Sequence, residues 1–494
     1  ITKWLSLHLK STVNHKDNDQ PANVGRGFSA ERFATDVKPL MPVYHPDGHF
    51  SGQGNFTNPF AVIATGARDT YKSDDIWITS GFTLTPIKNI KIVGDYTWNP
   101  YHMNSKNNVK MFKEYGAPTD GTSIYDPDKA TDLGYYPHNT PATVYEANSH
   151  DLYKAANIYA QYENTFAEKH YFKAMVGYNQ ESKHNESFSV QVKNLVNQDY
   201  PFLKLNNDDK PSVGSGISDW ALIGSFFRLN YVYNQKWLVE VNGRYDGSSR
   251  FSRENRYVFS PSASLGWRIS KEKFFEPINS VVSDLKFRAS YGKLPNQQVN
   301  ALYPYLPTMP YGNQTGYIFG TQQLPYVSAP GLVSNNFTWE EVATRNFGVD
   351  FGFLNNRLTG SFDYYIRNTT GMLVNGLALP AVLGVGAPQR NAADLETKGF
   401  ELTLGWHDAI GEDFKYGVSF NLADSRSFIT KYDLNPTGSL GDYYVGREIG
   451  EIWGYTTEGL YQTDEDAAKL DKTKLAGYKW LAGDVKYKDL NNDG

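Results

Sequence analysis

The chain has 494 residues, a formal net charge of −5 and no cysteine. Without cysteine there is no thiol catalysis and no disulfide scaffold, and a slightly acidic chain with no basic block is a poor match for nucleic acid. Aromatic residues reach 15% although mean hydropathy is −0.53. That combination suits a barrel in a membrane, with polar loops and lumen, and equally a soluble β-protein that handles carbohydrate. No apolar run approaches the ~18 residues of a transmembrane helix.

Alternating side chains and turn signals predict about thirteen strands. In chain order we expect them near residues 3–10, 76–85, 90–98, 157–165, 171–181, 225–233, 236–247, 257–269, 285–292, 345–354, 357–367, 398–406 and 414–423. Bacterial single-chain barrels have an even number of strands, so an odd count favours a partial chain. The chain also begins at Ile1 rather than Met and ends inside an apparent motif. We therefore expect it to be a piece of a longer protein.

The alternation is clearest between Ser225 and Ile269. Over 237–245, one set of side chains is Trp237, Val239, Val241 and Tyr245, and the other set is Leu238, Glu240, Asn242 and Arg244. Successive side chains of a strand point to opposite faces. The same pattern recurs over 257–269, 347–353 and 400–406. An aromatic-rich apolar face opposite a polar face predicts a transmembrane antiparallel β-barrel, with lipid outside and a wet lumen.

The links between the expected strands alternate in length. Short links are expected at 87–89, 166–170, 234–235, 355–356 and 408–413, and long links at about 99–156, 182–224, 293–344 and 368–397. The link 247–255 is a modest long one, and 270–284 is a lengthened short one that we expect to hold a helical turn. Membrane barrels have short periplasmic turns and longer extracellular loops, whereas soluble sandwiches and propellers have no reason to sort loop length by side.

Several segments in order carry a family resemblance. They are 245–251, 259–269, 285–292, 339–340, 346–351, 396–402 and 483–494, beginning with Tyr245-Asp246-Gly247-Ser248-Ser249-Arg250-Phe251. This series resembles the SusC/RagA type of TonB-dependent outer-membrane transporters of Bacteroidota. The resemblance is specific from about residue 225 onward and weaker before it.

The resemblance implies an all-β fold that is part of a plugged barrel of about 22 strands. On this interpretation residues 1–494 are part of the barrel domain, and the N-terminal plug, the coupling motif and the C-terminal closing strands are absent from this chain. It also implies a bacterial outer-membrane location, membrane lipid around the barrel, TonB engaged through the missing N-terminal part, and a SusD-like surface lipoprotein. A dimer of transporter–lipoprotein pairs is left open.

The resemblance further implies active import of nutrient oligomers, with oligosaccharide favoured over peptide as cargo and no cofactor required. Two alternatives remain at this point: a passive porin or adhesin-like barrel without energy coupling, and a soluble all-β glycan-active protein. We expect no enzyme activity, because the ten His residues form no HExxH-like spacing and no GxSxG elbow occurs. Paired carboxylates on loops are what a chain with this many acids contains anyway.

Loop aromatics are the candidate cargo contacts. The link 294–337 carries Tyr303, Tyr305, Tyr311 and Tyr317 among prolines and glycines, and Tyr443 and Tyr444 lie in a later loop. Aromatic rings with polar tips suit stacking against sugar rings or peptide side chains. The alternative is that these tyrosines pack the loop onto itself at the barrel mouth.

Two charged motifs complete the candidates. Arg244, Asp246, Arg250 and Arg253 cluster near a strand end, either as a patch that contacts plug or cargo or, as we favour, as an ion-pair network that fixes a hairpin. The final segment 489–494 matches the first half of a calcium loop, with Asp489, Asn491 and Asp493 at alternate positions. It would hold a structural Ca²⁺ or Mg²⁺, although Asn-Asp-Gly is also ordinary turn chemistry.

Overall fold

The structure is a computed structural model. It describes residues 2–22, 42–52, 58–116, 131–135, 140–299, 301–313, 320–321, 325–334, 336–469 and 480–490. Within these ranges, thirteen strands form one antiparallel sheet in chain order, and three small two-stranded sheets lie outside it. No helix in the described part of the chain is long and apolar enough to cross a membrane.

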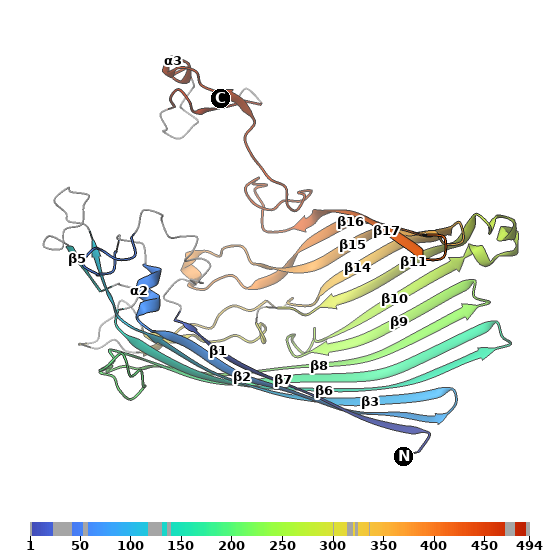
Figure 1. Cartoon of the computed structure of the whole chain (residues 1–494), viewed down its shortest axis with the longest axis horizontal. Helices are drawn as coiled ribbons and strands as arrows, with labels where there is room; N and C mark the ends of the chain where they lie inside the picture. The colour runs from blue at the N-terminus through green and yellow to red at the C-terminus, as the bar shows by residue number, and fades with distance from the viewer. Residues whose placement is uncertain are drawn as a thin grey trace.

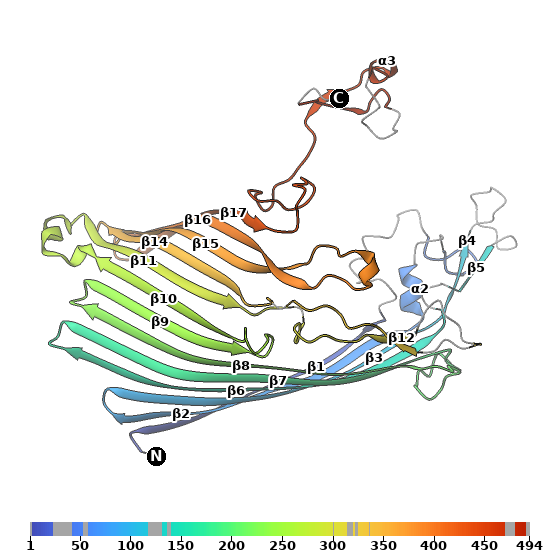
Figure 2. The ribbon, with the colours of Figure 1, turned by 180° about the vertical axis from the view of Figure 1, so that it is seen from behind.

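The thirteen strands correspond one to one with those expected from the sequence. They are β1 (Leu5–Pro21), β2 (Arg68–Ile87), β3 (Ile90–Val109), β6 (Thr143–Phe166), β7 (His170–Lys193), β8 (Ser212–Tyr233), β9 (Trp237–Ser248), β10 (Tyr257–Arg268), β11 (Val282–Asn296), β14 (Glu340–Phe353), β15 (Leu358–Asn375), β16 (Gln389–Ile410) and β17 (Phe414–Tyr432). Figures 1 and 2 show them side by side as one curved sheet, with β1 and β17 as its two edges.

Short and long links lie at opposite ends of the sheet, as predicted. At one end of the sheet the strands are joined by tight turns such as 167–169 and 234–236, and at the other end by longer links such as 194–211 and 297–339. The lengthened short link between β10 and β11 contains the predicted helical turn, as the 3-10 helices η2 (Ile269–Lys271) and η3 (Lys273–Ile278). Below, these two sides are called the turn end and the loop end.

Smaller elements occupy the loops. Within them lie α2 (Pro59–Ala64), the hairpin strands β4 (Lys113–Gly116) and β5 (Thr131–Tyr135), β12 (Tyr311–Asn313) and β13 (Pro325–Val327), and η4 (Ala381–Leu383). After β17 come β18 (Thr457–Leu460), α3 (Asp464–Ala467) and β19 (Val485–Tyr487), which stand apart from the sheet in Figure 1.

The register carries the apolar side chains across neighbouring strands on one face. Val239 of β9 pairs with Leu265 of β10 on one side and with Tyr231 of β8 on the other. Further along, Phe287 pairs with Val349, which pairs with Phe362. Because side chains at paired positions point to the same face of a sheet, these residues form one continuous apolar surface, called here the outward face.

The outward face is exposed rather than packed against protein. Val241 is 37% exposed, Leu265 47% and Phe347 58%. A soluble protein seldom leaves so extended an apolar surface open to water, whereas hydrocarbon would cover it without cost. The outward face therefore has the character of a lipid-facing surface, which agrees with the faces assigned from the sequence.

Aromatic pairs mark both limits of the outward face. At the turn end, the rings of Trp237 and Trp267 stack with centroids 5.0 Å apart. At the loop end, Tyr245 and Tyr257 stack with centroids 5.4 Å apart. From Trp237 to Tyr245 is about 26 Å along a strand at ~3.3 Å per residue, or about 20 Å across a membrane at a tilt of ~40°. That spacing is close to the ~25 Å apolar band between the aromatic girdles of membrane barrels.

Candidate functional site

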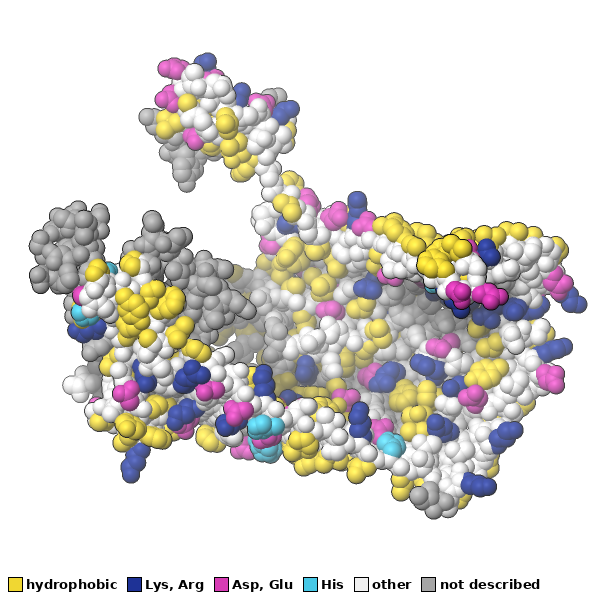
Figure 3. All heavy atoms as spheres, in the orientation of Figure 1, with side chains coloured by type: hydrophobic (Ala, Val, Ile, Leu, Met, Phe, Trp, Pro, Cys, Tyr) yellow, Lys and Arg dark blue, Asp and Glu magenta, His cyan; other side chains and the backbone are white. Residues whose placement is uncertain are grey.

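The inward face of the sheet is lined by polar side chains that bind one another across strands. Asn242 of β9 accepts from the Arg228 guanidinium at 2.7 Å and donates to Glu240 at 2.8 Å and to Ser262 at 3.2 Å. Figure 3 shows that Lys, Arg, Asp and Glu side chains are distributed over the hollowed side of the molecule. The predicted wet face is therefore present, and on β8, β9 and β10 these polar groups bind one another across strands.

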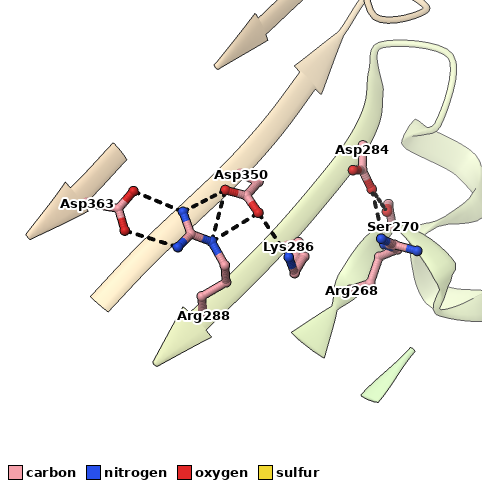
Figure 4. A network of polar contacts seen from close by, with 7 residues as sticks. All are labelled: Arg268, Ser270, Asp284, Lys286, Arg288, Asp350 and Asp363. Atoms are coloured by element: carbon pink, nitrogen blue, oxygen red, sulfur yellow. Dashed lines mark hydrogen bonds and ion pairs between the residues drawn. The ribbon is translucent and has the colours of Figure 1, made fainter. Parts of the chain in front are cut away.

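A charge cluster on β11, β14 and β15 is the most ordered part of this wall. The Arg288 guanidinium lies between two carboxylates, with Nη2 2.8 Å from Asp350 and 2.9 Å from Asp363 (Figure 4). Lys286 adds a third contact, 3.2 Å from Asp350. Two N–H groups of Arg288 reach each carboxylate, which is the forked geometry that a planar guanidinium favours.

Gly348 makes room for the contacts of Arg288 with Asp350 and Asp363, called here the Arg288 clamp. A Cβ at that position would lie 2.6 Å from Asp363 Oδ1 and 2.7 Å from Arg288 Cζ. The guanidinium therefore crosses β14 where there is no side chain. In the sequence, Lys286 and Arg288 alternate along one strand, and Asp350 and Asp363 lie on the two strands that follow in the sheet. The sequence analysis does not predict the clamp, because it does not establish which residues of these strands are paired.

A hollow of about 880 Å³ opens on the same face toward the turn end. Its lining includes Arg268, Lys271, Asp284 and Asp350, together with small side chains of β15 and β16 such as Thr359 and Thr403. Ser270 Oγ donates to Asp284 at 2.6 Å, which ties the η2 turn to the start of β11 (Figure 4). Charged and small polar side chains are therefore among those that line the hollow, and most of the lining residues belong to strands of the sheet.

The arginine cluster predicted near Tyr245 separates into two parts. Arg244 pairs with Asp246 at 2.7 Å and donates to Asn179 of β7 at 3.0 Å. Arg250 instead lies over the ring of Trp220, 5.8 Å from its centroid, and donates to the carbonyl of Gln297 at 3.3 Å. No contact of Arg253 with the others is present among the described residues. These contacts link strands and loops, which fits the hairpin-fixing interpretation.

A buried aromatic cluster holds the loop end together. Phe251, Phe337 and Trp339 are almost fully buried, and the Phe251 and Trp339 rings stack with centroids 4.5 Å apart. The indole N–H of Trp339 donates to the Asn255 carbonyl at 2.9 Å. Asn391 accepts from the Thr338 N–H at 3.0 Å and donates to its carbonyl at 2.9 Å. The links before β10 and β14 and the first residues of β16 are therefore packed into one unit.

The predicted cargo tyrosines are partly engaged in such packing. The Tyr303 hydroxyl donates to the Asp219 carbonyl at 2.6 Å, and that of Tyr305 donates to the Ser249 carbonyl at 3.2 Å. Partial burial, with the nearby charge of Asp219, raises the pKa of Tyr303, so the phenol stays protonated and can donate. Tyr303 lines a hollow of about 230 Å³ with Lys154 and His184. Both hydroxyls are used by the protein itself, which favours the packing interpretation for this pair.

The other predicted tyrosines are distributed differently. Tyr311 lies in β12 and is 74% exposed, whereas Tyr317 lies outside the described residues. Tyr443 and Tyr444 flank the Arg447 guanidinium, which is 5.5 Å and 5.8 Å from their ring centroids. The structure therefore does not gather the described candidate tyrosines at one place, and contact of the six with cargo stays a prediction.

The predicted cation loop is only partly described. Asp489 lies in the described part of the chain, and Asn491 and Asp493 lie outside it. Across the described ranges, no group of three or more acidic or histidine side chains is placed to hold a metal ion. The calcium loop stays a prediction, and a calcium titration of a protein that continues past Gly494 would test it.

The fold and the inward wall together define a class of protein: a membrane barrel wall with an apolar outside, a polar and hollow inside, and packed loops at one end. Comparison with known families is consistent with this class. The family model of the TonB-dependent receptor-like β-barrel matches residues 16–493. The chain belongs to the TonB-dependent receptor family, of the SusC/RagA type, and so to the β-barrel proteins of the bacterial outer membrane.

Individual relatives support this placement. The chain is 33% identical over 453 residues to the TonB-dependent receptor SusC of Bacteroides thetaiotaomicron, covering 89% of the chain and 43% of that protein. It is 26% identical over 515 residues to the TonB-dependent receptor P26 of Formosa agariphila, covering 99% of the chain and 48% of that protein. The chain thus spans less than half the length of these curated relatives.

A solved structure supports the fold. The structure of the RagAB peptide transporter aligns with a TM-score of 0.74 at 20% identity, covering 94% of this chain and 50% of that one. At this level of identity the likeness concerns the fold alone. The predicted family and fold class are therefore confirmed, and cargo and partners are treated below as proposals.

Proposed function

We propose that the protein to which this chain belongs actively imports nutrient oligomers through the outer membrane, driven by TonB. The observation that carries the proposal is a TonB-dependent receptor barrel with a charged, hollowed inward face and an apolar outward face. A barrel of this kind separates cargo from lipid, and its polar wall offers hydrogen bonds to a hydrated cargo.

We favour oligosaccharide over peptide as the cargo. The relative with 33% identity carries the name SusC, whereas the RagAB relative, described as a peptide transporter, is only 20% identical. A SusD-like lipoprotein partner is part of the proposal, and it rests on the chain belonging to the SusC/RagA type. We propose no catalytic role, because the named relatives are receptors and transporters.

The test is uptake of labelled oligosaccharides by cells that carry the whole protein, with and without functional TonB. The proposal expects uptake that is lost without TonB and without the proposed lipoprotein partner. Uptake that continues without TonB would instead support the alternative, a passive porin-like barrel. Conversion of the sugar by the purified protein would contradict the assignment as a transporter only.

A further inference from the structure

We propose that a row of aromatic and polar side chains on the inward wall, near the loop end, is a binding track for a neutral oligosaccharide. The inference rests on the proposed import function and deepens it, because it names the residues that contact cargo and the chemistry that they select. The row crosses five strands and comprises Trp77 of β2, Asn99 of β3, Tyr153 of β6, Lys183 of β7, Trp220 of β8 and, beyond the end of β9, Arg250.

The strand register places this row on the inward face. Asn99 pairs with Tyr153, Tyr153 with Lys183, and Lys183 with Trp220. Two residues nearer the turn end, Leu222 of β8 pairs with Ser248 of β9. Ser248 lies an even number of residues from Arg244 and Asn242, so it shares their face. The row therefore belongs to the same wet wall as the Arg244–Asp246 pair.

The three aromatic rings form a contiguous surface. The Tyr153 ring centroid is 5.9 Å from that of Trp77 and 6.3 Å from that of Trp220. The Arg250 guanidinium extends the surface at 5.8 Å from the Trp220 centroid. Trp77 is 39% exposed, and neither Tyr153 nor Trp220 is buried. Large partly exposed rings on the wet wall of a barrel have no lipid to face, and they are therefore available to a solute in the lumen.

The rings are held by hydrogen bonds that orient them. The Trp77 indole N–H donates to Asp75 at 3.0 Å, and Asp75 also accepts from Asn99 at 2.6 Å. The Tyr153 hydroxyl donates to Glu181 at 3.1 Å. These contacts fix both rings in place, so that little side-chain entropy remains to be lost when a ligand binds.

Charges of both signs are interspersed along the track. Lys183 pairs with Asp151 at 2.7 Å, and Asp151 also accepts from Asn185. Asp75 and Glu181 each accept hydrogen bonds from neutral groups of the track. No stretch of a single sign is left to select a charged ligand. A strongly acidic or basic peptide would therefore gain little here.

What the track does offer is flat apolar ring faces beside carboxylate, amide and ammonium groups. The C–H faces of pyranose rings are apolar and their rims carry hydroxyls, so sugars stack on aromatic rings and bind to polar groups at the edge. An oligosaccharide that passes along the wall would therefore bring successive sugar rings against successive aromatic side chains. The match is to a neutral oligosaccharide of several units.

The position of the track suits capture. Trp220 lies on the loop side of Ser225, the residue of β8 that pairs with Tyr245 at the outer aromatic limit. The track is therefore near the mouth of the hollow, where cargo enters, rather than near the turn end. A surface of several residues that each bind weakly would hold the cargo here before the cargo moves deeper into the barrel.

The experiment is calorimetric titration of the purified whole protein in detergent with maltoheptaose, cellohexaose and a fructan oligomer, and with an uncharged Gly/Ser peptide of similar length. We expect at least one oligosaccharide to bind and the peptide not to bind. Trp220→Ala and Tyr153→Ala should each weaken binding about tenfold, equivalent to about 1.4 kcal/mol. Tyr153→Phe keeps the ring and should weaken binding less than about threefold.

Trp98→Ala is the matched control, because Trp98 neighbours Asn99 in β3 and points to the opposite face. It should leave the affinity unchanged, and heat-modifiable mobility of each variant on a gel reports that the barrel is folded. Equal affinities of wild type, Trp220→Ala and Tyr153→Ala would overturn the track. So would binding of none of the three sugars, or Trp220-dependent binding of the peptide alone. TonB-dependent uptake that continues undiminished in the Trp220→Ala variant would sink the track and leave the proposed function standing.

Discussion

At the scale of single residues, glycines let aromatic rings lie flat on the sheet. Phe227 is paired with Gly243, and its ring occupies the space where a Cβ of Gly243 would lie, 2.4 Å from Cε1. The same arrangement joins Phe351 to Gly360, with 2.5 Å to Cζ. A ring laid over a cross-strand glycine covers the exposed backbone and fixes the register. These glycines are thus part of the packing of the wall.

The two faces of the sheet should differ in how well they tolerate a charged side chain, and two adjacent residues of β9 test this difference. Val241→Arg places a charge on the outward face and should cost about 2–4 kcal/mol of folding free energy near the membrane midplane. Asn242→Arg lies on the inward face among Glu240 and Ser262 and should cost far less. Folding titrations in lipid vesicles measure both. Equal losses for the two variants would contradict the assignment of the faces.

The clamp around Arg288 depends on the missing side chain at position 348. Gly348→Ala should destabilise the barrel by about 1–3 kcal/mol, because the methyl group displaces the guanidinium from one of its two carboxylates. Gly216→Ala in β8 is the control, since its Cβ would meet only Ser187 Oγ at 3.4 Å. Unfolding in lipid measures the difference, and two equally stable variants would show that the clamp tolerates a side chain beneath it.

At the scale of elements, the sequence located every strand of the sheet and underestimated the length of most. Residues 157–165 were expected as a strand, and β6 runs over Thr143–Phe166. The alternation of apolar and polar residues exists only where one face meets lipid. Beyond that band both faces are wet, and Glu146, Asn148 and His150 on the outward side read as loop. The expected long link 182–224 is shortened to 194–211 for the same reason.

The charged and aromatic groups of the wall were less predictable than the strands. Asp350 lies 62 residues and Asp363 lies 75 residues after Arg288 in the chain. Only the pairing of β11, β14 and β15 brings the three side chains together. Trp77 lies in the expected strand 76–85, but Tyr153 and Trp220 lie in parts of β6 and β8 outside the expected strands 157–165 and 225–233. Phe251 and Trp339 belong to family-like segments of the sequence, but residue spacing does not predict that their rings touch.

The loop unit built on Phe251 and Trp339 should be cooperative. Trp339→Ala removes a ring that is 6% exposed and the bond to Asn255, at a cost of about 3–5 kcal/mol within this unit. Hydrogen exchange should then rise together in the links before β10 and β14 and at the start of β16, with little change in the turn-end hairpins. Tyr311→Ala, at a residue that is 74% exposed, is the control and should change nothing. Faster exchange confined to one of these segments would show that the segments are independent.

At the scale of the whole molecule, the two ends of the sheet are asymmetric in a way that fixes its orientation. Tight turns such as 167–169 lie at one end, and the loop cluster, the aromatic track and the long links lie at the other. In outer-membrane barrels the long loops are extracellular and the short turns periplasmic. Cargo would therefore meet the track before the Arg288 clamp and the hollow of about 880 Å³ near the turn end.

This orientation is testable because the chain has no cysteine of its own. Val382→Cys, at a loop residue that is 91% exposed, should react with a membrane-impermeant maleimide on intact cells. Lys169→Cys, at an exposed position of the β6–β7 turn, should react only after the outer membrane is opened, since an intact membrane keeps the reagent from the periplasmic side. The readout is the labelled fraction before and after permeabilisation, in a background without other cysteines. Labelling of Lys169→Cys but not Val382→Cys on intact cells would invert the orientation, and full labelling of both would mean that the sheet does not span the membrane.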